Sequence, residues 1–110
     1  MKLVIILVLF SLPVFAATHQ VALTWTQTID PVALNCIARS VTSGTENFST
    51  PLFCSTSPIT LYTDTTVQGG DTWYYEVDAV NSKGQVSPGS NEVKTVIPLF
   101  APTNLQAVSQ

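Results

Sequence analysis

The chain has 110 residues, which is enough for one small domain. Hydrophobic residues make up 45% and charged residues 10%, which excludes a disordered polar tail and a basic nucleic-acid binder. Seven acidic against four basic residues give a net charge of −3, which repels phosphate backbones and argues against DNA or RNA as a partner.

The first residues have the pattern of a secretory signal peptide. Lys2 gives a positive start, residues 3–14 are almost wholly apolar, and the small residues Ala16 and Ala17 follow. The apolar run is shorter than the roughly 20 residues that a membrane-spanning helix needs. We therefore expect residues 1–16 to be a signal peptide cleaved after Ala16, or else after Ala17. The mature chain is then secreted, periplasmic or on the cell surface, and has no membrane span.

Beyond residue 17 the sequence indicates short strands and turns rather than helices. Thr, Val, Ser and Tyr are abundant, and Gly, Pro, Asn and Asp recur at short intervals. Six strands are predicted, over residues 19–27, 34–40, 48–54, 59–63, 72–80 and 91–97. Pro51 marks the third of them as an edge strand, since proline cannot donate to a ladder. This spacing predicts an all-β sandwich or barrel.

The fifth predicted strand has the clearest alternation. Trp73, Tyr75 and Val77 share one face, which we expect to lie in the core. Glu76 and Asp78 share the opposite face, which we expect to be solvated.

A joint pattern resembles the fibronectin type III domains of secreted bacterial proteins. It consists of LYTDTTV at 61–67, GGDTWYY at 69–75, VDAVN at 77–81 and SPGSNEV at 87–93. The resemblance covers about residues 19–98. It implies an immunoglobulin-like sandwich over residues 17–98, whose predicted strands are B, C, C′, E, F and G, and it places Trp25 in the core between two sheets.

The sequence departs from that family at three points. Strand C usually carries a tyrosine in this family, and here it has Leu34, Asn35, Cys36, Ile37 and Ala38 instead. Trp73 stands where the family has a tyrosine whose hydroxyl bonds back across the corner, so either Tyr74 or Tyr75 takes over this bond or it is absent. Strand A is missing, because only a few residues separate the expected cleavage site from strand B.

The end of the chain resembles the strand that is missing. APTNLQAV at 101–108 is similar to the strand A start of such a domain. The usual strand A starts roughly 20–30 Å away, at the far end of the sandwich. Residues 98–101 reach at most about 14 Å. We therefore interpret residues 99–110 as a linker and the truncated start of a second repeat.

Cys36 and Cys54 are the two cysteines, in a chain expected to be exported, where disulfides persist. A hairpin centred on Thr45, next to Gly44, places residues opposite each other when their numbers sum to 90, and this pair does. Facing Cβ atoms lie near the separation that a disulfide needs. The sequence favours a disulfide over two separate free thiols.

The sequence contains no convincing catalytic, cofactor or metal site. His19, the one histidine, lies at the expected mature N-terminus, and no metal-ligand spacing occurs. Asp30, Asp64 and Asp71 stand beside turns, where aspartate bonds local backbone N–H groups.

We therefore expect a non-catalytic spacer or protein-interaction module of a larger exported protein, with partners among other domains or proteins at the cell exterior. The alternative is a carbohydrate-binding accessory module of an extracellular glycan hydrolase, which would bind polysaccharide. That alternative needs a planar row of exposed aromatics, for which Tyr74, Phe48 and Phe53 are the candidates.

Overall fold

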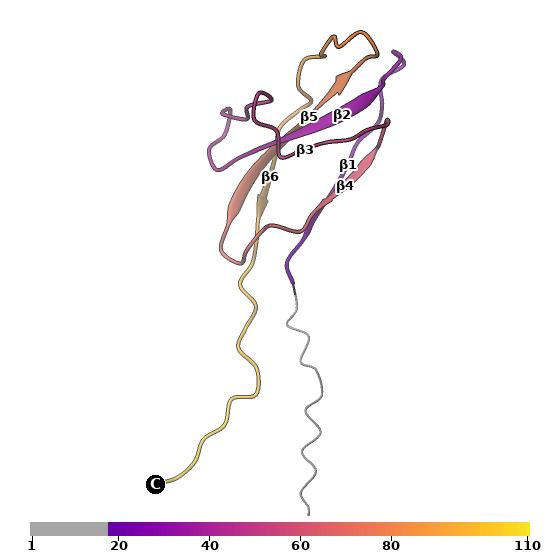
Figure 1. Ribbon diagram of the computed structural model, residues 1–110. Coiled ribbons are helices and arrows are strands. Elements are labelled where there is room, and N and C mark those ends of the chain that lie inside the picture. Colours follow the sequence, from indigo (N-terminus) through magenta and orange to yellow (C-terminus); the bar gives the residue numbers. More distant parts are fainter. Residues whose placement is uncertain (1–17) are drawn as a thin grey trace, which may run out of the picture.

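The structure is a computed structural model, which describes residues 18–110 (Figure 1). The predicted signal peptide at residues 1–16 lies outside the described residues. Six strands form, namely β1 Val21–Thr24, β2 Leu34–Ser40, β3 Phe53–Cys54, β4 Leu61–Asp64, β5 Thr72–Val80 and β6 Val93–Val96. They make two antiparallel sheets, one of order β1-β4 and one of order β3-β2-β5-β6. The expectation of an all-β protein with two sheets is confirmed.

The central pair, β2 and β5, has the bounds that the sequence predicts. It pairs from Leu34 opposite Val80 to Ser40 opposite Tyr74, and this is the longest ladder of the molecule. β5 is rich in aromatic and β-branched residues that suit a pleated surface, and neither strand contains proline or glycine. The other strands attach to this pair or cover it. Across the described part of the chain, no helix is long and apolar enough to cross a membrane.

The third strand is much shorter than predicted. A turn at Asn47 occupies the start of the predicted range, where the Thr50 amide donates to the Asn47 carbonyl and the Ser49 amide donates to the Asn47 side chain. Pro51 then delays regular pairing until Phe53. Only Phe53 and Cys54 pair with β2 in strand geometry.

The last strand begins later than predicted because serine side chains replace part of the backbone ladder. The Val77 amide donates to Ser90 Oγ and the Ala79 amide donates to Ser87 Oγ, both at 2.9 Å. The amides of Ser90 and Ser87 donate in return to the Val77 and Ala79 carbonyls at 2.8 Å. The segment before β6 therefore follows β5 through alternating side-chain and backbone bonds rather than as a regular strand.

The core lies between the two sheets and is centred on Leu23, Ile37 and Tyr75. Tyr75 is 1% exposed. The other three predicted core residues pack against this centre but are only partly buried, namely Trp25, Trp73 and Val77. β1 has one neighbouring strand, β4, among residues 18–110, so the described sheets contain no strand in the position that strand A would take.

The outer face of the four-stranded sheet is also covered, which the sequence did not predict. Ala38 is 0% and Asp78 4% exposed, although both point away from Ile37 and Tyr75. The bridge from Cys36 to Cys54 and the loops that carry Phe48 and Gly89 lie over this face, since a Cβ on Gly89 would meet both Glu76 and the Phe48 ring. The expectation that Asp78 is solvated is therefore wrong, because two loops cover its side of the strand.

Candidate functional site

Cys36 and Cys54 form a disulfide across β2 and β3. The two residues are direct partners in the register, and their Cα atoms are 4.1 Å apart. The predicted bridge is confirmed, and the alternative of two free thiols is wrong. The bridge fastens the two-residue edge strand β3 to the centre of its sheet. A disulfide of this kind is consistent with an oxidising compartment.

A buried polar network lies beside the disulfide. Asp78 Oδ1 accepts a hydrogen bond of 3.2 Å from the Cys36 amide, and burial raises the pKa of the Asp78 carboxyl, partly opposed by that bond. The Asn35 side chain, 1% exposed, donates to the Asp78 carbonyl and exchanges two bonds with Gln27. Every polar group named here has a partner, as buried polar groups require. The network therefore fixes β2 against β5 and against the segment after β1 that carries Gln27.

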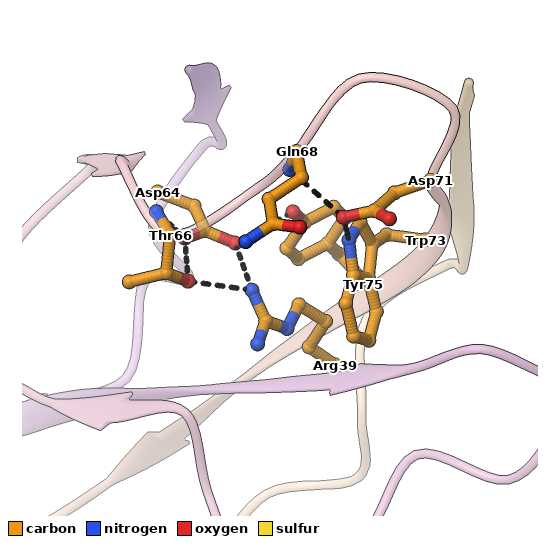
Figure 2. Close-up of polar contacts among 7 residues, drawn as sticks. All are labelled: Arg39, Asp64, Thr66, Gln68, Asp71, Trp73 and Tyr75. Atoms are coloured by element: carbon orange, nitrogen blue, oxygen red, sulfur yellow. Dashed lines mark hydrogen bonds and ion pairs between the residues drawn. The ribbon is translucent and has the colours of Figure 1, made fainter. Parts of the chain in front are cut away.

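A second polar network joins three strands across the core, and Figure 2 shows it. Asp64 ends β4 and is 0% exposed. Its Oδ2 accepts hydrogen bonds from Arg39 Nη1 at 2.8 Å and from the Tyr75 hydroxyl at 2.7 Å. Its Oδ1 accepts from the amide and the hydroxyl of Thr66. One carboxylate thus holds β2, β4 and β5 together.

These contacts set the ionisation of the network. Burial acts to raise the pKa of Asp64, but hydrogen bonds from Thr66, Tyr75 and Arg39 outweigh it and hold the pKa below its usual value. Burial and the bond to the Asp64 carboxylate raise the pKa of Tyr75 well above its usual value. The pair is therefore a fixed charge and a fixed neutral donor at physiological pH. Such an arrangement clamps the sheets and leaves no free nucleophile or base at this point.

Arg39 is held on its other side by Trp73. The guanidinium lies 3.8 Å from the centre of the Trp73 ring, and the indole N–H donates to Asp71 Oδ2 at 3.0 Å (Figure 2). Asp71 also accepts from the Gln68 amide, so Asp64 and Asp71 both bond nearby backbone amides, as predicted. Asp30 is exposed and accepts no such bond among the described residues.

The sequence analysis missed the pair of Arg39 and Asp64. Arg39 shares its strand face with Ile37, and a charge on the core face of a strand needs a buried partner. The position of Arg39 on the same strand face as Ile37 could have indicated a buried acidic partner. It could not indicate which of the seven acidic residues that partner would be.

Three carboxylates gather on the outer face. Oxygen atoms of Glu46, Glu76 and Glu92 lie within 4.8 Å of one another. Ser43 and the Gly44 amide donate to Glu92 at 2.5 and 2.7 Å, which lowers the Glu92 pKa. Burial and a proton shared with Glu92 raise the pKa of Glu46. Oxygen donors of this kind suit a hard cation, and the shared proton is the other way to relieve the repulsion.

The candidate aromatics do not form one flat row. Phe53 stacks on Tyr62 of the other sheet, with ring centres 4.6 Å apart. Tyr74 lies on β5 with the Lys94 ammonium 6.0 Å from its ring centre. Since β2 separates β3 from β5, Phe53 and Tyr74 cannot be neighbours in a row.

A groove runs along the edge of β1 that β4 does not cover. Three hollows follow one another there, lined on one side by residues 18–22, then 23–25, then 25–30. Residues 95–100, 90–93 and 87–90 line the opposite side in the same order. The buried indole N–H of Trp25 has no hydrogen-bond partner among the described residues, and Trp25 lines the second and third hollows.

Both ends of the described domain lie at one pole of the sandwich. His19, just before β1, stacks on Phe100, just after β6, with ring centres 3.8 Å apart. Beyond Phe100 the tail leaves the sheets, and Figure 1 shows it (yellow) running away from the domain.

The comparisons with known proteins gave no match, either to a protein-family model or to a curated protein.

Proposed function

We propose that the chain is a non-catalytic protein-interaction module of an exported protein, built on a fibronectin type III-like sandwich. The observation that carries the proposal is the open edge of β1 with its groove, since an unpaired strand edge offers backbone groups to an extended partner. The disulfide and the signal-like N-terminal sequence support export.

The position of the two ends of the domain favours a protein-interaction role over a spacer role. A spacer that extends a chain in line has its two connections at opposite poles. Here His19 and Phe100 stack at the same pole, so the domain is attached to the rest of an exported protein from one pole only. The groove along β1 remains presented to partners.

Site-specific photo-crosslinking on cells that export the protein tests the proposal. A photoreactive amino acid is placed at Thr24, which is exposed beside the groove. In a matched variant it is placed at Ser82, in an exposed turn that lines none of the three hollows along β1. We expect protein adducts from the position of Thr24 and none from that of Ser82. Equal labelling at both positions, or none at Thr24, would contradict the proposal.

The carbohydrate-binding alternative is tested with the same protein. Phe53 and Tyr62 supply a stacked aromatic pair at the surface, with Phe53 37% exposed. In affinity gels, a polysaccharide that binds the protein slows its migration. If Phe53→Ala abolishes this retardation and the variant at Thr24 gives no crosslinked adduct, the carbohydrate-binding alternative is favoured over the interaction module.

A further inference from the structure

The open edge of β1 has free backbone groups at defined positions. The Trp25 amide donates to the Thr60 carbonyl at 3.1 Å, in the same register that pairs Leu23 with Tyr62. In an antiparallel ladder the bonding residues alternate, so Leu23 and Trp25 bond β4. The N–H and C=O groups of Ala22 and Thr24 therefore point to the open edge.

Among the described residues, this edge lacks the usual protection against a further strand. Natural sheets block their edges with lysine, proline, bulges or covering loops. Residues 20–29 contain no charged residue and no proline, and Ala22 and Thr24 are exposed. An added strand would also bring carbonyl groups into the groove, where the Trp25 indole N–H has no partner among the described residues.

The tail of the chain has the composition and length of the missing strand. Residues 98–110 are all exposed, including Leu105 at 96% and Val108 at 81%. Residues 101–108 carry no charge and would span about 27 Å when extended. In a strand, Leu105 and Ala107 would share the inward face, while Asn104 and Gln106 would face solvent. The edge from residue 20 to residue 27 also has eight positions.

Residues 101–108 cannot enter the groove of their own molecule as a strand antiparallel to β1. A strand antiparallel to β1 must start beside Gln27, roughly 23 Å from Gln20 along the strand. The tail starts beside His19, on which Phe100 stacks, and residues 100–103 span only about 10 Å. No such limit applies to a tail that comes from another molecule.

Resting on the proposed interaction function, we propose that residues 101–108 of one copy fill the β1 groove of a second copy as an antiparallel strand. Each copy then donates one strand and receives one. The contact joins different surfaces, so it closes as a mutually exchanged dimer or continues as a chain of copies.

Two variants test the two halves of this contact separately. Leu105→Asp puts a charge on the inward face of the tail, and it cannot unfold the domain because Leu105 is 96% exposed. Its matched control, Gln110→Asp, puts the same charge outside the segment. Thr24→Lys blocks the open edge, and Leu61→Lys puts the same charge directly opposite, since these two residues are cross-strand partners. Circular dichroism checks the fold of the two lysine variants.

Sedimentation velocity then gives the result. We expect association of the unchanged protein and both controls, and monomers for Leu105→Asp and for Thr24→Lys. An equimolar mixture of the two test variants should form a one-to-one dimer, because one retains a working edge and the other a working tail.

The inference would be overturned if the unchanged protein stays monomeric at every soluble concentration. It would also be overturned if the Leu105→Asp variant still associates. A monomer whose tail amides are protected from exchange would also overturn it, since its own tail would then dock. If the protein stays monomeric but the photoreactive group at Thr24 captures a different exported protein, this inference fails while the proposed function stands.

Discussion

The Tyr75 hydroxyl, on β5, donates a hydrogen bond of 2.7 Å to the Asp64 carboxylate at the end of β4, in the other sheet. Both side chains are buried, at 1% and 0% exposed. The Tyr75 hydroxyl therefore links the two sheets by bonding a side-chain carboxylate, whereas the hydroxyl of a tyrosine corner bonds a backbone group.

Tyr75→Phe should destabilise the protein by about 1–3 kcal/mol, because it removes one donor from a buried carboxylate and keeps the ring. Chemical denaturation at neutral pH measures this. Tyr74→Phe is the matched control on the adjacent position, and it should change the free energy of unfolding much less. Equal effects of the two substitutions would show that the bond to Asp64 contributes nothing.

Acid should remove the contribution of Asp64. Its folded pKa is lowered, so its stabilisation is fully present above the unfolded value of about 3.8 and is lost as the pH falls through the folded pKa. Unfolding free energies measured from neutral pH down to below that value should therefore fall, and Asp64→Asn should flatten the fall. An unchanged pH dependence in Asp64→Asn would contradict the low pKa.

Loss of the disulfide should lower the free energy of unfolding by roughly 2–4 kcal/mol, since the bridge closes a loop with a sequence separation of 18. A reductant should shift the unfolding midpoint of the natural protein. The double variant Cys36→Ala with Cys54→Ala should be insensitive to it. A reductant effect of similar size in the double variant would mean that the shift has another cause.

Glu46→Gln should stabilise the protein at neutral pH. The folded pKa of Glu46 is raised by burial and by the proton shared with Glu92, so its favourable contribution is present below the unfolded value of 4.5 and is lost as the pH rises through the folded pKa. An amide at this position keeps a donor at all pH values, and we expect a gain of up to about 1 kcal/mol because solvent screens this partly exposed cluster. Thermal unfolding across this pH range checks it, with Asp30→Asn as the exposed control. A gain that is the same at acid and neutral pH would contradict the shared proton.

The sequence predicted the parts of the fold that depend on local pattern. β5 has the predicted bounds because its alternation is long and uninterrupted, and β2 has them because turn residues stand on both of its sides. The turn next to Gly44 predicted the register that pairs Cys36 with Cys54. The burial of Asp78 was not predictable in this way, because alternation separates two faces without saying that loops cover the second one. The partner of Arg39 lies 25 residues away, and only the three-dimensional arrangement selects Asp64 from the other acids.

Amide hydrogen exchange at the edge of β1 tests the central claim most directly. In dilute protein, the amides of Leu23 and Trp25 should be protected by β4, whereas those of Ala22 and Thr24 should exchange freely. Raising the protein concentration should protect Ala22 and Thr24 in the unchanged chain and not in Leu105→Asp. Protection of Ala22 and Thr24 already in the dilute monomer would mean that the edge is covered within one chain, and it would contradict the account of an open docking edge.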